Sequence, residues 1–302
     1  MSFSRPRSAG SARTAVLSLA VLAMTVAAGG CATSGQSDPA RGGAASGARP
    51  GIGPESGGAA SAGARSAAAS PAVASPSPAA LPLAGRVVGI DPGHNGGNFS
   101  DPGYIDQQVW NGREDENCDT TGTQTADGFT EASFNFDVAT YLRADLTAEG
   151  ATVVMTRQSN DGVGPCVTTR AQIINSAHAD VAIDIHADGG PAWGRGFTVL
   201  EPVADGPNDA VIGSSQQFGA DVRAALLADT SMPESDYYGT NGLINRDDLA
   251  GLNLTTVPKV LVECGNMPNP TDAGMLESPA FQQQLAQAFT TAIIAFVTGQ
   301  PG

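Results

Sequence analysis

The sequence predicts an α/β fold of three layers, in which helices cover both faces of a twisted, mostly parallel β-sheet. Short apolar runs rich in valine and isoleucine alternate along the chain with longer segments whose apolar residues recur at helical spacing. Such alternation is typical of a parallel sheet whose strands are joined by crossover helices. Because parallel sheets are buried on both faces, helices are expected on either side.

The strands are predicted where short apolar runs are bounded by turn-forming residues. The first of them, RVVGI, ends directly before the polar stretch DPGHNGG. Ligands of such sheets bind beyond the carboxyl ends of the strands, so the residues that follow each strand are the first candidates for a site. Runs of this character lie at 86–90, 151–156, 180–186, 196–200 and 259–263.

The helices are predicted from apolar positions that share one face. In the segment 130–150, Phe134, Val138 and Leu142 lie on one side of a helix, and Thr130 is a suitable N-cap. The last helix is expected to hold a proline in its first turn, where the missing N–H costs nothing. Further helices are predicted over 168–178, 213–229 and 278–299.

The first 31 residues have the character of an export signal. Three arginines precede an apolar run, 15–28, that is too short to span a membrane as a helix, and small residues follow it. Cys31 directly after AAGG resembles the acylated cysteine of bacterial lipoproteins, although Ala28 stands where leucine is usual. We therefore expect residues 1–31 to be a signal of the lipoprotein type, with lipidation at Cys31. Ordinary cleavage nearby is the alternative.

The next segment, 32–83, consists almost entirely of alanine, glycine, serine and proline, a composition that predicts a disordered linker. The catalytic domain is expected over 84–302. Of the 15 basic and 30 acidic residues of the chain, six arginines and two acids lie in 1–84, which leaves 9 basic and 28 acidic residues beyond it. A domain this acidic is not expected to bind nucleic acid, or a membrane surface other than through an N-terminal anchor.

A long polar insertion, 95–129, separates the first strand from the first long helix. Cys118 lies in it, and Cys166 lies in another glycine-containing loop. Because an exported chain keeps disulfides, we expect these two cysteines to pair. Cys264 stands beside an apolar strand and is expected to be a buried thiol. The insertion is expected either to shape the cleft or to be a decoration of the fold.

Four residues with metal or proton chemistry are expected at one edge of the sheet. His94 follows the first strand, while His186 and Glu263 close two others at their carboxyl ends. Glu131 begins the first long helix and returns to the same edge if that helix packs antiparallel to its strands. Two histidines and one carboxylate can hold a catalytic zinc ion, and a second carboxylate can move a proton. The chain has no HExxH motif, so it does not follow the helix-borne zinc proteases.

These segments resemble the zinc-dependent N-acetylmuramoyl-L-alanine amidases of the type-3 amidase family, and within it the small actinobacterial members. The resemblance spans roughly residues 85–297 and implies a sheet of about six strands. It implies one zinc ion per chain, held by His94, Glu131 and His186, with Glu263 as the catalytic acid and base. The segments that carry it are VVGIDPGHNGG, TEASFNFDVATYLRADLTAEGATVVMTR, RAQIINSAHADVAIDIHADG and VLVECGNMPNP.

Several residues near these motifs are candidates for supporting roles. Asp188 and Asn266 stand where many family members carry other residues, so they are candidates for binding substrate at the rim of the site. Arg170 and Arg195 are expected either to bind a substrate carboxylate or to form structural ion pairs. Asp91 is expected either to accept a hydrogen bond from His94 or, as the first residue of a turn, to bond its own backbone.

The activity that the resemblance implies is hydrolysis of the amide between muramic acid and L-alanine in peptidoglycan. The expected partners are peptidoglycan or muramyl-peptide fragments, and the chain is expected to be an exported monomer at the cell wall. Two alternatives stay open. One is a zinc peptidase that cuts within the stem peptide, and the other is a lipoprotein that binds peptidoglycan without cleaving it.

Overall fold

The computed structural model describes residues 80–299, so the predicted signal, Cys31 and most of the predicted linker lie outside the described residues. The described part contains a six-stranded sheet with the strand order β4-β1-β5-β8-β6-β7. The first four strands in this order are parallel, and β6 and β7 run in the opposite direction. The predicted mostly parallel sheet is therefore confirmed. The strands are β1 (Val87–Pro92), β4 (Thr152–Met155), β5 (Val181–Asp188), β6 (Thr198–Pro202), β7 (Leu243–Arg246) and β8 (Lys259–Asn266).

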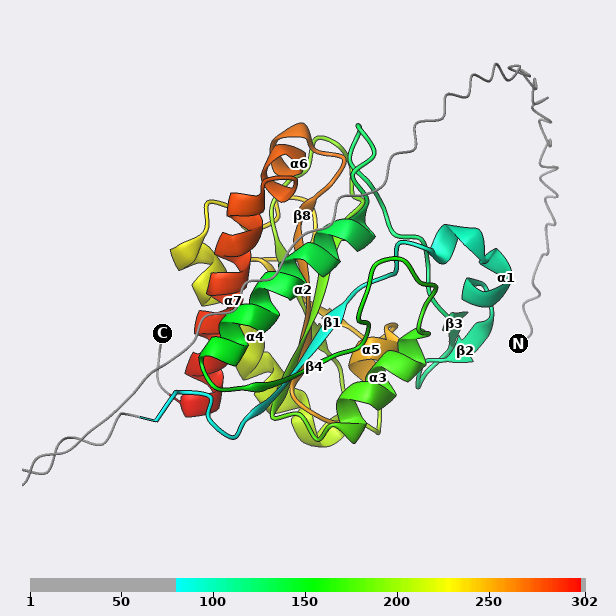
Figure 1. The fold of residues 1–302 in the computed structure, drawn as a ribbon. Helices are drawn as coiled ribbons and strands as arrows, with labels where there is room; N and C mark the ends of the chain where they lie inside the picture. The colour runs from blue at the N-terminus through cyan, green and yellow to red at the C-terminus, as the bar shows by residue number, and fades with distance from the viewer. Residues whose placement is uncertain (1–79, 300–302) are drawn as a thin grey trace, which may run out of the picture. The chain divides into compact units, whose positions relative to one another are not determined.

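Helices lie on both faces of the sheet, as Figure 1 shows. One face carries the three long helices α2, α4 and α7, together with the short α6 at the end of β8. The other face carries α3 and α5, beside which the insertion folds. The helices are α1 (Pro102–Ile105), α2 (Glu131–Ala148), α3 (Val167–Ser176), α4 (Ile212–Asp229), α5 (Ala250–Asn253), α6 (Pro270–Leu276) and α7 (Pro279–Thr298).

The two faces of the central strands differ in chemistry. Side chains alternate along a strand, and in β5 Ile183 and Ile185 point into the large core under the long helices. The residues between them, Asp184 and His186, therefore point to the opposite face. On that face the apolar clusters are small, and one of them centres on Leu261. The face that carries the long helices stabilises the fold by apolar burial, and the opposite face is free to hold polar groups.

Three features differ from the sequence prediction. The strand β7 was not predicted, because its four residues include the polar Asn245 and Arg246 at its end. The first strand runs on through Asp91 and Pro92, so Asp91 does not begin a turn. The insertion, in which no element was predicted, holds a short 3-10 turn (Asn98–Ser100), the helix α1 and a hairpin of β2 (Gln108–Trp110) and β3 (Asp115–Asn117). Among residues 80–299, the helices are all too short or too polar to cross a membrane.

Candidate metal centre

The carboxyl ends of β1, β5 and β8 meet at one edge of the sheet. His186 and Glu263 are direct neighbours across β5 and β8. His94 lies just past the end of β1, in a left-handed conformation with φ of 57°. A residue with a β-carbon pays a steric cost for this conformation, and such strain is concentrated at functional sites. The turn after β1 thus places the His94 ring beside the end of β5.

Glu131 reaches the same edge from the other face of the sheet. It is the first residue of α2, and the side chain of the N-cap residue Thr130 accepts a hydrogen bond from the backbone of Ser133. The Glu131 carboxylate is buried and is held by backbone N–H groups of Thr123 and Ala187, at 2.9 and 3.3 Å. The start of this helix therefore presents a fixed, ionised carboxylate to the two histidines.

The two histidines and Glu131 surround one point. Oε1 of Glu131 lies 2.8 Å from Nδ1 of His186 and 3.2 Å from Nε2 of His94. The two imidazole rings are nearly perpendicular, with centroids 4.9 Å apart. Nitrogen and oxygen atoms of the three side chains all lie within 4.8 Å of one another. Two imidazoles and one carboxylate are the donor set of many catalytic zinc sites, so these residues could hold a metal ion.

The electrostatics of this point favour positive charge. Burial alone would lower the pKa of His94, but Glu131 and Asp119 outweigh it and raise the pKa to about 9. Burial also disfavours the charged form of His186, yet Asp184 and Glu131 raise its pKa well above the ordinary value. In the metal-free protein the carboxylates therefore draw protons onto the rings, and a divalent cation would compete with those protons for the same nitrogen atoms.

Glu263 lies beside the three side chains, and among residues 80–299 its carboxyl group forms no ion pair. Its Oε2 atom is buried and has no hydrogen-bond partner within residues 80–299. Burial is the main cause that raises the pKa of Glu263 to about 8; the charges of His186 and His94 oppose the shift, and those of Glu131 and Asp188 add to it. A carboxyl group with a pKa near neutrality can both take up and release a proton.

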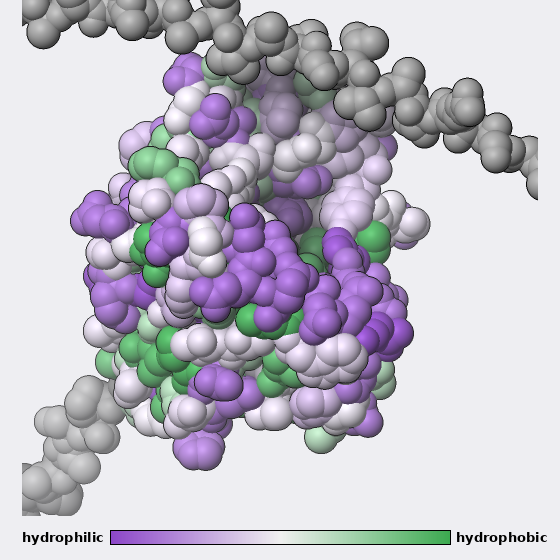
Figure 2. All heavy atoms as spheres, turned by 90° about the vertical axis from the view of Figure 1, so that its right-hand side faces the viewer, coloured by the Kyte–Doolittle hydropathy of each residue, from purple (hydrophilic) through white to green (hydrophobic). Residues whose placement is uncertain are grey.

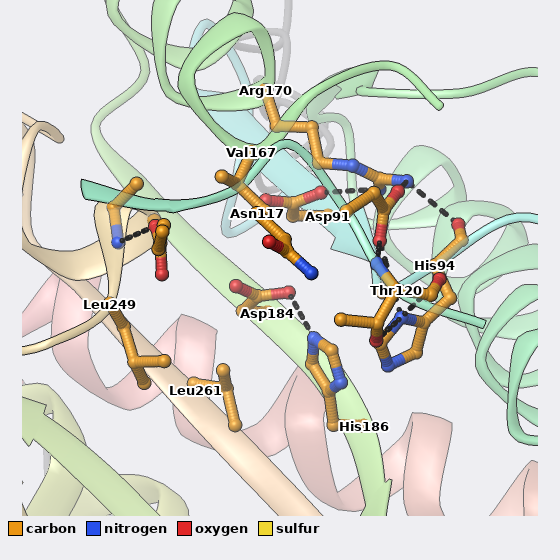
Figure 3. Close-up of a pocket in the computed structure, with 15 residues that line it drawn as sticks. Asp91, His94, Asn117, Thr120, Val167, Arg170, Asp184, His186, Leu249 and Leu261 are labelled. Carbon is orange, nitrogen blue, oxygen red and sulfur yellow. Dashed lines mark hydrogen bonds and ion pairs between the residues drawn. The ribbon is translucent and has the colours of Figure 1, made fainter. Parts of the chain in front are cut away.

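Two adjoining cavities meet at the histidines. The outer one, of about 330 Å³, is lined by Glu131, Asp188, Arg246 and Glu263, and the inner one, of about 400 Å³, runs under the insertion. His94 and His186 line both. Figure 3 shows the inner cavity, and Figure 2 shows that the face bearing the insertion is hollowed and mostly hydrophilic. A substrate that spans both cavities would pass directly over the two rings.

Comparisons with known proteins identify the family. A model of the N-acetylmuramoyl-L-alanine amidase family matches residues 88–295. An N-acetylmuramoyl-L-alanine amidase of Mycobacterium tuberculosis, Rv3717, is 41% identical over 220 residues, which cover 72% of this chain and 89% of that protein. The chain belongs to the N-acetylmuramoyl-L-alanine amidase family. The resemblance that was expected from the sequence is thereby confirmed.

Solved structures of amidases are also similar to this chain. The amidase is 44% identical to Ami1 of Mycobacterium smegmatis, with a TM-score of 0.68, over 72% of this chain and 99% of that one. Ami1 of Mycobacterium abscessus, described in its apo form, is 43% identical with a TM-score of 0.67 and is covered completely by 71% of this chain. The expected three-layer fold is that of these relatives.

Two of the candidate substrate-binding residues lie near the cleft but differ in access. Asp188 lines the outer cavity and accepts a 2.7 Å hydrogen bond from the hydroxyl of Tyr237. Asn266 is fully buried, and its amide nitrogen donates to the carbonyl groups of Pro191 and Gly194. Asn266 therefore fixes the loop after β5, and the structure does not leave its amide nitrogen free for substrate.

The two arginines and Asp91 have partners inside the protein. Arg170 is buried in an ion pair with Asp91, and Arg195 pairs with Asp272 at 3.1 Å. Both arginines therefore form a structural ion pair, which was one of the two roles expected for them.

The prediction for Asp91 is wrong, because its side chain neither accepts a hydrogen bond from His94 nor begins a turn. Its oxygens accept hydrogen bonds from Thr156, Arg170 and Lys259. The residues beside the His94 ring are Asp119 and Thr120, each with an oxygen 3.2 Å from Nδ1.

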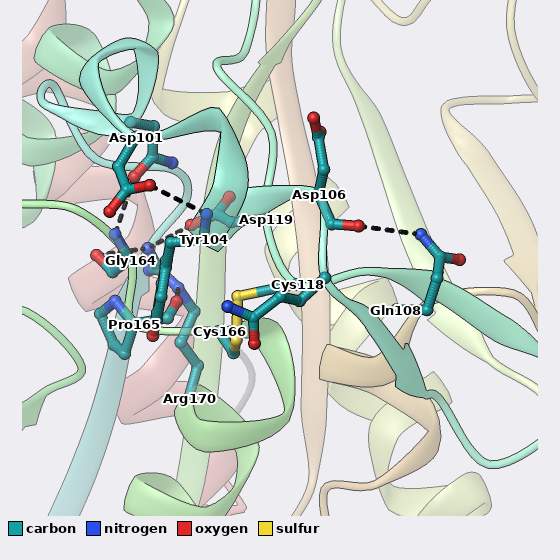
Figure 4. Close-up of a disulfide and its surroundings, with 12 residues drawn as sticks. Asp101, Tyr104, Asp106, Gln108, Cys118, Asp119, Gly164, Pro165, Cys166 and Arg170 are labelled. Atoms are coloured by element: carbon teal, nitrogen blue, oxygen red, sulfur yellow. Dashed lines mark hydrogen bonds and ion pairs between the residues drawn. A yellow bond between two sulfur atoms is a disulfide. The ribbon is translucent and has the colours of Figure 1, made fainter.

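The predicted disulfide between Cys118 and Cys166 is present, and Cys264 is a buried free thiol, as expected. Figure 4 shows this disulfide, which joins Cys118, the residue after β3 of the insertion, to the start of α3. The insertion is therefore not a mere decoration of the fold, because it lines the inner cavity and supplies Asp119 next to the disulfide.

Sequence reasoning missed three charged residues next to the site, namely Asp119, Asp184 and Lys259. A usable signal existed for two of them. Asp184 stands two residues before His186, and Lys259 stands four residues before Glu263, so each lies on the same face of its strand as a site residue. For Asp119 the only signal in the sequence was its position next to Cys118, which was predicted to form a disulfide.

Proposed function

We propose that the chain is a zinc-dependent amidase that hydrolyses the bond between the lactyl group of N-acetylmuramic acid and L-alanine in peptidoglycan. The observation that carries this proposal is the convergence of His94, Glu131 and His186 on one point, with the unpartnered carboxylate oxygen of Glu263 beside it. The names of the related amidases supply the bond that is cleaved.

The donor set fits zinc. His94 would bind through Nε2, His186 through Nδ1 and Glu131 through Oε1, because these atoms face one another. Three protein ligands leave a further coordination position open, as catalytic zinc sites require. Zinc in such a site polarises a carbonyl oxygen and makes water a better nucleophile at neutral pH.

Glu263 carries the proton in this proposal. Its carboxylate takes a proton from the attacking water and later donates it to the departing nitrogen of L-alanine. Burial and the neighbouring carboxylates hold the pKa of Glu263 at about 8 without a bound cation. With a cation held by the neighbouring ligands, Glu263 would have a lower pKa and would be ionised when the water attacks. The outer cavity, which Glu263 lines, is where the departing stem peptide is expected.

The cellular setting is also a proposal. We propose export to the cell wall, as for a cell-wall amidase, with residues 1–31 as the signal, the linker from residue 32 up to the folded domain as a tether and Cys31 as a site of lipidation. The folded domain begins before the predicted residue 84, because Leu83 is fully buried in the core and its N–H donates to the carbonyl oxygen of Glu149. The acidic domain is proposed to act as a monomer on peptidoglycan or its muramyl-peptide fragments, and not on nucleic acid. Any contact with the membrane would be made through the N-terminal anchor.

Mass spectrometry of a muramyl-peptide digest tests this function. The full chain is incubated with the substrate with and without a zinc chelator. A product with a free alanine N-terminus and an intact muramic acid, lost on chelation, supports the amidase. Cleavage inside the stem peptide indicates the peptidase instead. Tight peptidoglycan binding with no product in the presence of zinc indicates the binding protein that was the other alternative.

A further inference from the structure

A buried chain of charged side chains begins at His94. Nδ1 of His94 lies 3.2 Å from Oδ1 of Asp119, the charged one of its neighbours, and equally far from the carbonyl oxygen and the hydroxyl of Thr120. Oδ2 of Asp119 is 3.2 Å from Nη2 of Arg170, and Nη1 of Arg170 is 3.0 Å from Oδ1 of Asp91. Arg170 also donates to the carbonyl oxygen of His94 itself, at 2.7 Å. The ring and the backbone of His94 are thus both tied to one guanidinium group.

The same series of charged side chains continues from Asp91 to His186. Oδ2 of Asp91 accepts a 2.8 Å hydrogen bond from Nζ of Lys259, and this ammonium group is 3.3 Å from Oδ2 of Asp184. Oδ1 of Asp184 is buried, has no hydrogen-bond partner within residues 80–299, and lies 3.4 Å from Nε2 of His186, so this ring nitrogen is the nearest donor for it. Figure 3 shows Asp184 pointing toward this ring. A continuous series of charged contacts therefore joins the two histidines from behind.

The fold brings these groups together in two ways. Asp91 and Asp184 are paired across β1 and β5, and Lys259 at the start of β8 points to the same face, so three strands supply three of the five linking side chains. The disulfide helps to place the other two. It joins Cys118, the residue before Asp119, to the N-cap residue of α3, and Arg170 lies one turn further along that helix.

Stabilisation of the fold does not account for this arrangement. The five linking side chains are each no more than 7% exposed, so all of their charges have lost most of their water. Apolar residues of the same size stabilise a core as well as such buried pairs do, or better. The series of charged side chains ends in a carboxylate on both sides, Asp119 at His94 and Asp184 at His186. Each carboxylate lies next to the ring nitrogen that faces away from Glu131.

We propose that Asp119 and Asp184 are the positioning residues of the metal centre, and that Arg170, Asp91 and Lys259 hold them at fixed separation. This inference rests on the proposed zinc function. Asp119 accepts the Nδ1–H of His94, which leaves Nε2 free to bind the metal. Asp184 accepts the Nε2–H of His186, which leaves Nδ1 free. The two rings therefore bind through different nitrogen atoms, and each is fixed by its own carboxylate.

Zinc affinity tests the proposal directly. The full chain and its D119N and D184N variants compete for zinc with a chromophoric chelator. We expect each substitution to weaken zinc binding roughly 10- to 100-fold, the usual effect of losing such a partner. Asp272→Asn is the matched control, because Asp272 is also a fully buried carboxylate but pairs with Arg195. We expect D272N to bind zinc as the unaltered chain does.

Nitrogen NMR of the unaltered chain provides a test that needs no variant to fold. The chain has only three histidines, so their ring signals can be assigned. In the zinc-bound protein we expect an Nδ1–H form for His94 and an Nε2–H form for His186. The same tautomer at both rings would overturn the proposal, as would D119N and D184N variants that bind zinc as tightly as D272N. Failure of the unaltered chain to bind zinc at all would instead refute the proposed function.

Discussion

Gly93 packs directly against the imidazole ring of His186. A β-carbon at position 93 would lie 2.1 Å from Cε1 and 2.2 Å from Nε2 of that ring, closer than any real contact. The glycine before His94 is thus required by the other histidine of the site, on a neighbouring strand. Gly122 packs equally tightly against the third side chain of the site, because a β-carbon at position 122 would lie 2.7 Å from Oε2 of Glu131.

Replacing Gly93 by alanine is therefore expected to displace the His186 ring. A shift of about 1 Å in a catalytic group can reduce activity about 100-fold, and we expect a loss of that order together with weaker zinc binding. Zinc content after gel filtration and turnover of a muramyl peptide measure the two effects. Gly213→Ala is the control, since a β-carbon at that helical position meets open space. Equal zinc content and activity in G93A and G213A would contradict the packing argument.

Glu263→Gln separates the proton carrier from the metal ligands. The amide keeps the shape of the side chain but cannot take up a proton, so we expect turnover to fall by about 10²- to 10⁴-fold while zinc stays bound. The measurement pairs the initial rate of product formation with zinc content. Glu201→Gln, a change at a buried carboxylate of β6 that lines neither cavity, is expected to leave both unchanged. If E263Q kept most of the activity, the role given to Glu263 would be wrong.

The parts of the fold that the sequence predicts well are those with a strong apolar pattern. The strands at β1, β4, β5 and β8 and the long helices were found because each buries an apolar face. The strand β7 escaped because half of its four residues are polar and it lies at the edge of the sheet. The hairpin of the insertion escaped for the same reason, since β3 reads DEN and has no apolar residue.

The site divides in a similar way. Residues at the carboxyl ends of strands could be predicted to converge, because parallel strands share that edge. The partners of the histidines could not be predicted, because Asp119 and Arg170 are brought together by the disulfide and by tertiary packing. Asp91 was expected beside His94 from its position in the chain. The sequence alone does not reveal that Lys259, which is 168 residues away, is its partner.

Asp188 is expected to set the pH dependence of the reaction. Burial is the main cause of the raised pKa of Glu263, and the negative charge of Asp188 raises it further. Glu263 must be ionised to act as a base, so the rate falls as the pH drops through its pKa. Removing the charge with Asp188→Asn lowers that pKa, and we expect the acidic limb of kcat/KM to move to lower pH.

The control for this change is Tyr237→Phe. Asp188 accepts a hydrogen bond from the Tyr237 hydroxyl, and D188N alters that bond as well as the charge. Y237F removes the hydrogen bond and leaves the charge, so it is expected not to move the acidic limb to lower pH. A shift of the same size in both variants would mean that the hydrogen bond, and not the charge, controls the proton carrier.

Asp91 is expected to make the amidase sensitive to acid. Burial would raise its pKa, but Lys259 and Arg170 outweigh burial and hold the pKa well below the ordinary value of about 3.9. A carboxylate with a lowered pKa stabilises the fold fully above its unfolded pKa, and this stabilisation is lost as the pH falls toward the folded one. The free energy of unfolding is therefore expected to decrease below about pH 4.

Asp91→Asn tests this account through urea unfolding at several pH values. Removing one member of a buried ion pair costs about 3–5 kcal/mol, so we expect a loss of that size at neutral pH. The variant should then lose less of its remaining stability below pH 4, because the group that titrates there is gone. Asp247→Asn is the control, since Asp247 pairs with Arg113 on the surface, with both side chains more than 40% exposed, and is expected to cost less than about 1 kcal/mol. A D91N variant as stable as D247N would show that leaving Arg170 and Lys259 without this carboxylate costs little, which would contradict the prediction.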